Sequence, residues 1–326
     1  MIYKFPHDEA FLPRTKLSYI NLPGLLADGK RDRTARVSGF VQIQLGERCF
    51  LIFMRAGEPF HSVRIQPDAR GPAALSEVLR MVSTESERGE AGQIAYFGAS
   101  EAQLSAMLAT LLQEPIPWDD PLDDTRPEEL FPRLRARRFT GVLELFDGSR
   151  YHYLEFAEGA FRTGWFYGRD PAVPLPEVVR GVFAGASGTI RTGTYPAFAE
   201  MPVQAGPGLV DLYRRLIGGV LRELTNALGR ESALGVMRKG QAVAAMERAA
   251  ISAFQITDEG RVGGDPVAAP ELLTDGVAVW ITEALVSASD HHGVDPAGIV
   301  ERVARESRFV LAEQGFFSRL PWALAI

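Results

Sequence analysis

The amino-acid sequence predicts an α+β protein in which two tandem copies of a small sheet-and-helix domain precede an all-helical domain. A pattern of glycines and arginines in residues 36–57 recurs without a gap in residues 138–159, at a constant offset of 102. The matched pairs are Arg36/Arg138, Gly39/Gly141, Gly46/Gly148, Arg48/Arg150 and Gly57/Gly159. From residue 209 onward the apolar residues change to the i, i+3, i+4 and i+7 spacing of an amphipathic helix.

Each copy is predicted to run from a helix through β-hairpins to a second helix and a closing strand. The first matched glycine of each copy should open a strand. The second should lie in a turn, and the third in a further hairpin turn that requires positive φ. Val41, Ile43 and Leu45 alternate with period two, as in a strand. Residues 51–54 are continuously apolar and predict a central strand buried on both faces.

The repeat continues on both sides of this segment. The additional matched segments are 22–26 with 126–130, 75–82 with 175–182, and 92–94 with 188–190. Their offsets are 104, 100 and 96, so the insertions are small and fall between the predicted elements.

Proline and aspartate mark a linker at residues 115–124, and Trp118 within it is expected to pack onto a neighbouring domain. The first repeat domain then covers residues 1–114 and the second covers residues 125–206. A second connector, rich in proline and glycine, precedes the change of periodicity, so the helical domain covers residues 207–326.

The helical domain is predicted to be weakly duplicated, with Ile217/Ile281, Leu221/Leu285, Gly229/Gly293 and Ala233/Ala297 aligned at an offset of 64. An apolar stripe runs through residues 209–228 and ends near Gly229, a suitable C-terminal cap. Gly218-Gly219 interrupts it, which predicts a kink or the close approach of another helix. Further helices are predicted around 236–246 and 277–288, with a hairpin at 254–262 between them. A fourth helix should begin at Asp295-Pro296.

The second copy resembles a known bacterial family. Residues 140–146, 153–161 and 175–183, followed by Gly188-Thr-Ile190, give a Gly-led strand, a strand ending in an acidic-Gly turn, a third strand, a helix and a closing strand. This order is similar to the domain-of-unknown-function family named for the N-terminal region of the PatA-type response regulator of heterocyst-forming cyanobacteria. The first copy is similar more loosely, because Arg55-Ala-Gly57 replaces the acidic turn. The resemblance implies bacterial signalling beside receiver or small-GTPase-regulating modules, and it carries over no catalytic residue.

Composition indicates an ordinary globular protein. A net charge of −6 and a pI of 5.5 argue against nonspecific nucleic-acid binding by the whole chain. The first residues lack the basic and apolar regions of a signal peptide, and we expect no transmembrane segment because no stretch reaches about 18 uncharged apolar residues. The single cysteine, Cys49, falls in a predicted strand and is expected to be a buried, inert thiol. These features favour a cytoplasmic location.

Residues with catalytic or metal-binding chemistry are scattered along the sequence. Of the five histidines, His291 and His292 are adjacent, and adjacent residues of a helix diverge too far to share a metal. Residues 260–266 are rich in glycine but lack the Gly-Lys-Ser/Thr ending of a phosphate loop. The paired carboxylates in residues 119–129 suit a solvated linker and the start of a helix. We therefore predict no catalytic residue, metal or cofactor.

Basic residues cluster before the first strand of each copy. The clusters are Lys30, Arg31, Arg33 and Arg36, and Arg133, Arg135, Arg137 and Arg138. Solvated cations at a helix C-terminus would interact favourably with the macrodipole. Two related positive patches on an acidic protein would instead bind an acidic partner or phosphate groups. PilZ-type receptors of cyclic dinucleotides also use arginines that precede a barrel strand. Their companion motif, Asp/Asn-x-Ser-x-x-Gly, is absent from this sequence.

The C-terminal tail is unusually apolar for a chain terminus, which is normally loose. Its large apolar side chains are Phe316, Phe317, Leu320 and Trp322. They are expected to dock onto the helical domain, or alternatively onto another chain as the interface of a homo-oligomer.

These observations predict a non-enzymatic cytoplasmic signalling adaptor that binds a protein partner through the duplicated sheets, the arginine clusters or the helical domain. The resemblance makes a receiver-domain protein or a small GTPase the expected partner. One alternative is a sensor that binds a small ligand or cyclic nucleotide between the copies, and another is an unrecognised hydrolase or transferase. A sensor should show a polar cavity between the copies with the arginines converging on it, whereas an adaptor should show them on an open face.

Overall fold

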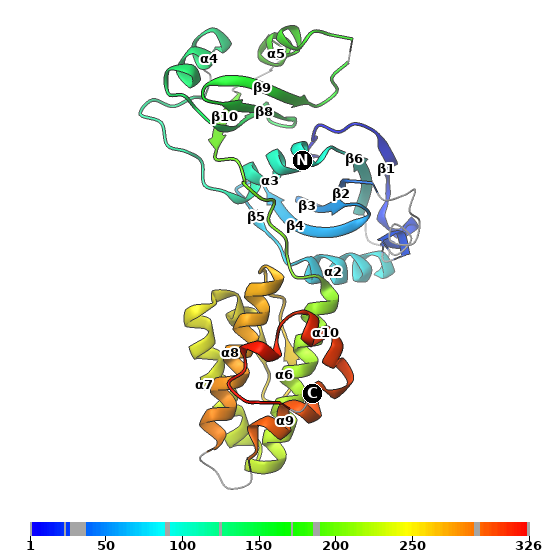
Figure 1. Ribbon diagram of the computed structural model, residues 1–326. Coiled ribbons are helices and arrows are strands. Elements are labelled where there is room, and N and C mark those ends of the chain that lie inside the picture. Colours follow the sequence, from blue (N-terminus) through cyan, green and yellow to red (C-terminus); the bar gives the residue numbers. More distant parts are fainter. Residues whose placement is uncertain are drawn as a thin grey trace. The chain divides into compact units, whose positions relative to one another are not determined.

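The computed structural model describes residues 2–22, 24–26, 37–88, 92–123, 126–170, 172–184, 190–289 and 294–324. These residues form helices and antiparallel sheets, and the α+β class is confirmed (Figure 1). The chain divides into two compact units, one of Met1–Ala73 with Val78–Pro202 and the other of Ala74–Glu77 with Val203–Ile326. The two repeats, expected as separate domains, therefore lie in one unit.

The first repeat forms a six-stranded antiparallel sheet with the strand order β1-β6-β2-β3-β4-β5. Its strands are β1 (Ala10–Lys16), β2 (Gly39–Leu45), β3 (Arg48–Arg55), β4 (Glu58–Gln66), β5 (Ala69–Pro72) and β6 (Gly92–Gly98). The short helix η1 (Leu17–Tyr19) follows β1. Residues 49–54 of β3 are all buried, which confirms the central strand predicted from residues 51–54.

The second repeat forms a four-stranded sheet with the order β10-β7-β8-β9. Its strands are β7 (Gly141–Phe146), β8 (Tyr151–Ala157), β9 (Ala160–Phe166) and β10 (Arg191–Tyr195). This order corresponds strand for strand to β6-β2-β3-β4 of the first sheet. Among the described residues, the first copy differs by its two edge strands, β1 and β5, which have no counterpart in the second sheet.

The matched glycines open β2 and β7 because a neighbouring strand approaches their α carbons closely. A Cβ atom at Gly39 would collide with the carbonyl oxygen of Phe97, and one at Gly141 would collide with the carbonyl oxygen of Tyr195. Phe97 and Tyr195 lie on β6 and β10, the equivalent closing strands. The repeated glycine therefore has the same steric cause in both copies.

The second hairpin turn is also the same in both copies. Its φ angles are 48° and 80° at Ala56 and Gly57, and 51° and 75° at Glu158 and Gly159. Two consecutive positive φ angles are typical of the type I′ turn, which matches the twist of a hairpin. The Ser38 hydroxyl accepts a hydrogen bond from the first turn, and the Thr140 hydroxyl accepts one from the second. The predicted turns are confirmed, and Ala56 in place of an acidic residue leaves the backbone conformation unchanged.

Helix α3 (Glu101–Leu112) lies between the two sheets (Figure 1). Its residues Leu104 and 106–111 are buried, on more than one face of the helix, and pack with apolar side chains of both sheets. From the second sheet these include Phe146 and Tyr153. A helix that is apolar all round is expected only where it is covered on all sides. The two copies therefore share one core, which the sequence analysis did not identify.

Each sheet carries helices on its other face. Helix α2 (Leu75–Arg88) lies on the side of the first sheet opposite α3 (Figure 1). Helices α4 (Pro127–Ala136) and α5 (Leu175–Ala184) cover the outer face of the second sheet, where Leu130 and Val179 pack against Leu154 and Phe156. The second repeat thus has one face against α3 and the other against α4 and α5.

The second unit is a helical bundle around one apolar core. Its elements are α6 (Pro207–Leu228), α7 (Arg230–Glu247), η2 (Ala249–Ala253), β11 (Gln255–Ile256), β12 (Val262–Gly263), α8 (Pro270–Ser289), α9 (Pro296–Ala304), η3 (Arg305–Ser307), α10 (Arg308–Glu313) and η4 (Phe317–Arg319). Asp295 caps α9 by accepting a hydrogen bond from the backbone N–H of Gly298, as predicted. Gly219 lies against Val303 of α9, so the close helix approach predicted for Gly218-Gly219 is confirmed at the second glycine.

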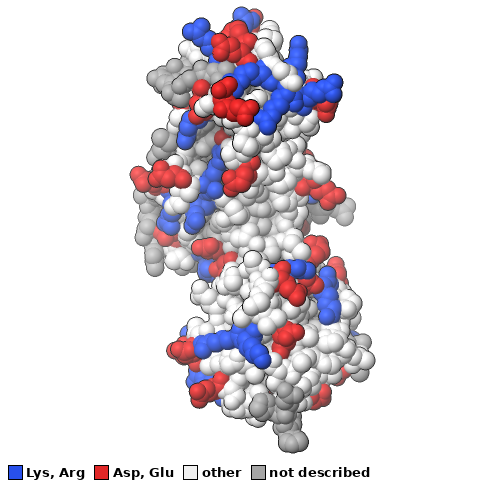
Figure 2. Space-filling model, turned by 90° about the vertical axis from the view of Figure 1, so that its left-hand side faces the viewer, with Lys and Arg blue, Asp and Glu red and all other residues white. Residues whose placement is uncertain are grey.

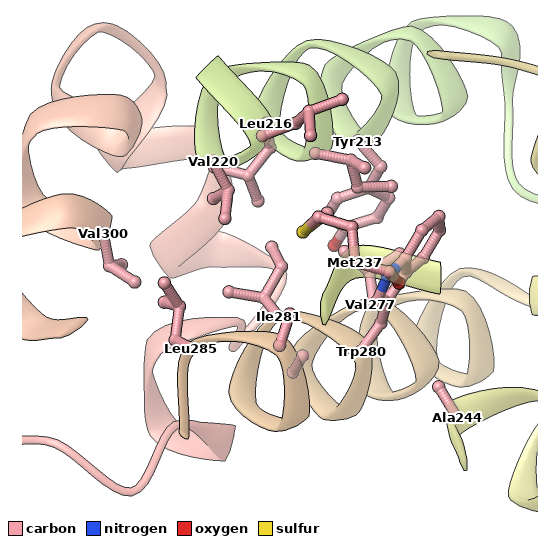
Figure 3. Close-up of a cluster of buried hydrophobic side chains, with 14 of the residues drawn as sticks. Tyr213, Leu216, Val220, Met237, Ala244, Val277, Trp280, Ile281, Leu285 and Val300 are labelled. Atoms are coloured by element: carbon pink, nitrogen blue, oxygen red, sulfur yellow. The ribbon is translucent and has the colours of Figure 1, made fainter. Parts of the chain in front are cut away.

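Helix α8 is the central helix of this bundle. Figure 3 shows Val277, Trp280, Ile281 and Leu285 of α8 facing Tyr213 and Val220 of α6. The Trp280 Nε1 donates a hydrogen bond to the Met237 carbonyl at 2.8 Å. By length and mean hydropathy alone α8 is long and apolar enough to cross a membrane, but 56% of its apolar window is buried inside the bundle. Its apolar character is explained by this core position.

Candidate functional site

A network of polar side chains joins the two repeats. Arg70 on β5 donates to both carboxylate oxygens of Glu144 on β7, at 2.7 and 2.9 Å, and to the hydroxyl of Tyr195 on β10. The Glu144 side chain is only 7% exposed and that of Arg70 is 26% exposed. Burial and the Glu144 carboxylate raise the pKa of Tyr195 to about 12. The Arg70 Nη1 donates to both Glu144 oxygens and Nη2 donates to Tyr195, so one guanidinium ties β5 to β7 and β10 and these residues act as a joint between the copies.

A polar cavity of about 490 Å³ adjoins this network, lined by residues of both copies. A ligand sensor should have such a cavity. The arginines that line it, however, are Arg70 and Arg191 rather than those of the predicted clusters. Arg70 is already paired with Glu144, and the Arg191 guanidinium lies 4.6 Å from the centre of the Phe146 ring. Both arginines of this cavity are thus engaged within the protein.

The described arginine cluster divides into two pairs with different surroundings. Arg133 and Arg137 hold the linker, since they donate to the carbonyl oxygens of Asp120 at 2.8 Å and Pro117 at 2.9 Å, respectively. Both guanidinium groups also lie over the Trp118 ring, at 5.7 and 4.5 Å from its centre. These two arginines therefore clamp the linker from the surface of the second repeat, where Arg137 is itself exposed.

Trp118 completes this clamp by donating from Nε1 to the Thr194 hydroxyl at 2.7 Å. Its packing onto the second repeat agrees with the expectation from the sequence. Arg135 and Arg138 are exposed. The first basic cluster, Lys30, Arg31, Arg33 and Arg36, lies outside the described residues.

An apolar groove of about 720 Å³ runs over the second repeat between α4, α5 and the hairpin of β8 and β9. Leu154, Phe156 and Val179 are buried in its floor, and Phe131 and Leu175 are partly buried at its sides. Phe161 also lines the groove and is 40% exposed. Charged side chains at the groove are Glu128, Arg135 and Arg180, all of them exposed.

The duplicated turn positions Arg135 at this groove. A Cβ atom at Gly159 would lie 2.7 Å from the Arg135 Cα and 2.9 Å from the Arg135 carbonyl oxygen. The end of α4 therefore rests directly on the β8–β9 turn, and only glycine fits there. Arg180 is on the facing helix, so one guanidinium comes from each wall of the groove. Arg135 is among the residues predicted from the sequence, whereas the apolar lining is not, because it comes from elements far apart in the chain.

The C-terminal tail packs onto its own helical unit. Phe316 is fully buried and Leu320 nearly so, and both belong to the core shared with Tyr213. Phe317 and Trp322 are partly buried against the same core. The intramolecular alternative from the sequence therefore describes these residues. They do not form a free surface for a second chain.

Three reactive side chains of the first unit, Cys49, His61 and His152, are buried. Burial raises the pKa of the Cys49 thiol to about 12, which confirms the predicted inert thiol. Burial lowers the pKa of His61 and of His152 to about 4, so both imidazoles are neutral at pH 7. The described residues contain no cluster of three or more His, Cys, Asp or Glu that could hold a metal. Asp290, His291 and His292 lie outside that part of the chain.

Charges of both signs lie next to one another on the face drawn in Figure 2. Recognition by charge on this face is therefore local and depends on individual side chains rather than on one long-range field. The groove of the second repeat combines such local charge with an apolar surface.

No protein-family model, no curated protein sequence and no solved structure matches this chain. The resemblance of the second copy to the PatA-type family therefore stays a prediction based on the residues quoted for it.

Proposed function

We propose that the protein is a non-enzymatic cytoplasmic signalling adaptor, and that it binds an amphipathic helix of a partner protein in the apolar groove of the second repeat. The observation that carries this proposal is the groove itself, an exposed apolar channel with one arginine on each side. Helix-in-groove recognition uses an apolar helix face as the anchor and charges at the rim for orientation. The proposed partner is a receiver-domain protein or a small GTPase, as the family resemblance implies.

The chemistry of the lining supports binding rather than catalysis. The described residues that line the groove are mostly aliphatic or aromatic, and they include no serine, threonine, cysteine, histidine or lysine. Glu128 is an exposed carboxylate with two exposed arginines on the same groove, an arrangement without a hydroxyl or thiol nucleophile or a histidine base. A cavity of this size accommodates several apolar side chains of a helix. Arg135 and Arg180 would pair with acidic residues that flank those side chains.

A photo-crosslinking experiment tests this function. A photoreactive phenylalanine analogue at Phe161, which is in the groove, is compared with the same analogue at Phe309, which is 76% exposed in the helical unit. The proposal expects a specific crosslink from position 161 to a helical segment with apolar residues at i, i+3 or i+4, and i+7, flanked by Asp or Glu. Identical crosslinks from both positions would contradict it, and so would a crosslink from position 161 to a β-strand or to a lipid.

Two substitutions then separate the apolar and charged contributions. Phe161→Asp should abolish capture of the crosslinked partner, since it places a charge on the apolar lining. Arg135→Glu combined with Arg180→Glu should weaken capture by at least tenfold. Arg162→Glu, on the same strand but outside the groove, is the matched control and should leave capture unchanged.

A further inference from the structure

A second cavity, of about 900 Å³, lies within the helical unit and has a different chemistry. Its charged lining consists of five arginines and three glutamates, namely Arg215, Arg222, Arg230, Arg302, Arg305, Glu223, Glu259 and Glu306. Arg302 is paired with Glu223, with which it makes hydrogen bonds of 3.0 and 2.8 Å. The other four guanidinium groups make no hydrogen bond or ion pair with the described residues. An excess of uncommitted positive charge therefore faces one cleft.

Two of these arginines stand on one face of α6 with a glycine between them. Arg215, Gly218 and Arg222 follow one another at i, i+3 and i+7, which is one line along a helix. The two arginine α carbons are seven residues apart, or roughly 10 Å along the helix axis. Both side chains are exposed to the cleft.

Gly218 leaves the space between these arginines open. Gly219 is required by packing, because a Cβ there would collide with Val303. Gly218 has no such requirement, since its Cβ would make only an ordinary contact of 3.7 Å with Val262. A glycine in a helix interior is less favourable than alanine. What it provides here is a bare stretch of helix surface on the cleft, flanked by two guanidinium groups.

Helix α7 begins at the same cleft. Its first residue, Arg230, lines the cavity, and no side chain in the described part of the chain caps the N-terminus of α7. The free N–H groups of a helix N-terminus attract anions, which adds to the effect of the arginines. Positive charge from α6, from α7 and from the η3 residue Arg305 thus converges from three elements.

We infer that this cleft is a binding site for a small molecule that carries two or more phosphate groups. Arginine binds phosphate oxygens through two parallel hydrogen bonds, and the spacing of Arg215 and Arg222 allows one phosphate group to be held by each. The volume lies within the range of small-molecule sites. This site is independent of the groove proposed above, because it belongs to the helical unit.

The test is equilibrium binding of inorganic pyrophosphate and tripolyphosphate to the full chain by calorimetry, with sulfate at equal ionic strength as the reference anion. The wild-type protein should bind tripolyphosphate more tightly than about 1 mM and more tightly than sulfate. Arg215→Gln with Arg222→Gln should weaken this binding by at least tenfold. Arg238→Gln with Lys239→Gln removes the same charge from α7 outside the cleft and should change binding less than twofold.

A steric pair of variants distinguishes the cleft from a general charge effect. Gly218→Leu fills the bare helix surface without removing charge and should abolish binding, whereas Gly218→Ala should retain it. Circular dichroism and thermal melting verify that each variant is folded. Equal loss of binding in the two charge pairs, unchanged binding in Gly218→Leu, or no binding of polyphosphate by the wild type would each overturn the proposal.

Discussion

The joint between the two repeats offers a quantitative test of the fold. Replacing Arg70 by methionine keeps most of the side-chain volume but leaves the Glu144 carboxylate, which is 7% exposed, without its cation. Breaking a buried ion pair by removing one partner costs about 3–5 kcal/mol. Because Arg70 itself is 26% exposed and water can reach the site, we expect the lower end, about 3 kcal/mol.

The reverse substitution should cost less. Glu144→Gln leaves the guanidinium of Arg70 without a counter-charge, but this group is partly hydrated and still donates to the Tyr195 hydroxyl and to the new amide oxygen. We expect a loss of about 2 kcal/mol. In the double variant neither charge remains, so its destabilisation should be smaller than the sum of the two single losses by at least about 1.5 kcal/mol.

Urea denaturation of the four proteins at pH 7, followed by tryptophan fluorescence, measures these free energies. Residues such as Trp118 and Trp165 report on the unit that contains the joint. The same cycle repeated at high salt should give nearly the same coupling, because a buried pair is little screened. A loss below about 1 kcal/mol for Arg70→Met, or single effects that simply add, would refute the view that this pair joins the copies.

Three further predictions concern other residues of the first unit. Burial lowers the pKa of His61 and His152 to about 4, whereas an unfolded imidazole titrates near 6.5, so the unfolded state binds protons first as the pH falls. The free energy of unfolding should therefore be constant above about pH 7 and decrease between pH 6.5 and 4, by up to about 3 kcal/mol per histidine. Urea denaturation midpoints that do not change between pH 6.5 and 4 would contradict this. Arg137→Ala removes one hydrogen bond and one cation–π contact from the linker. It should therefore lower the free energy of unfolding by about 1 kcal/mol and accelerate limited proteolysis at residues 115–123. An unchanged cleavage rate would argue against the clamp. Gly159→Ala should lower the free energy of unfolding more than Gly148→Ala does, by at least about 1 kcal/mol in thermal melts. Both glycines have positive φ, but only a Cβ at Gly159 would meet backbone atoms. Equal losses for the two variants would show that α4 moves to accommodate the Cβ.

The repeat was predictable because its residues have local steric causes. Gly57 and Gly159 lie in turns that require positive φ, and Gly39 and Gly141 lie where a strand passes too close for a side chain. Such constraints appear in a single sequence as fixed glycine spacing. The α6 helix and its end at Gly229 were likewise predictable from the periodicity and the cap.

Long-range partners were not predictable. The pairing of Arg70 with Glu144 and the apolar groove depend on segments that meet only after folding. The arginines before β7 illustrate the same limit, because the sequence does not distinguish Arg133 and Arg137, which hold the linker, from Arg135, which lies at the groove. Arg133 and Arg137 differ from Arg135 because they donate hydrogen bonds to backbone carbonyl oxygens of the linker. Every residue type has a backbone carbonyl, so the sequence does not mark these acceptors. Helix α3 was missed because an all-round apolar helix has no amphipathic pattern to detect.

Because α3 packs against both sheets, each copy depends on the other to cover its apolar surface. A fragment ending at residue 114 would expose the side of α3 that contacts Phe146 and Tyr153, and a fragment beginning at residue 125 would expose the face left bare by α3. Neither half is suited to folding alone in water. Supplied together, however, the halves carry complementary surfaces, so a chain severed in the linker should reassemble from its pieces, much as a split reporter regains its signal.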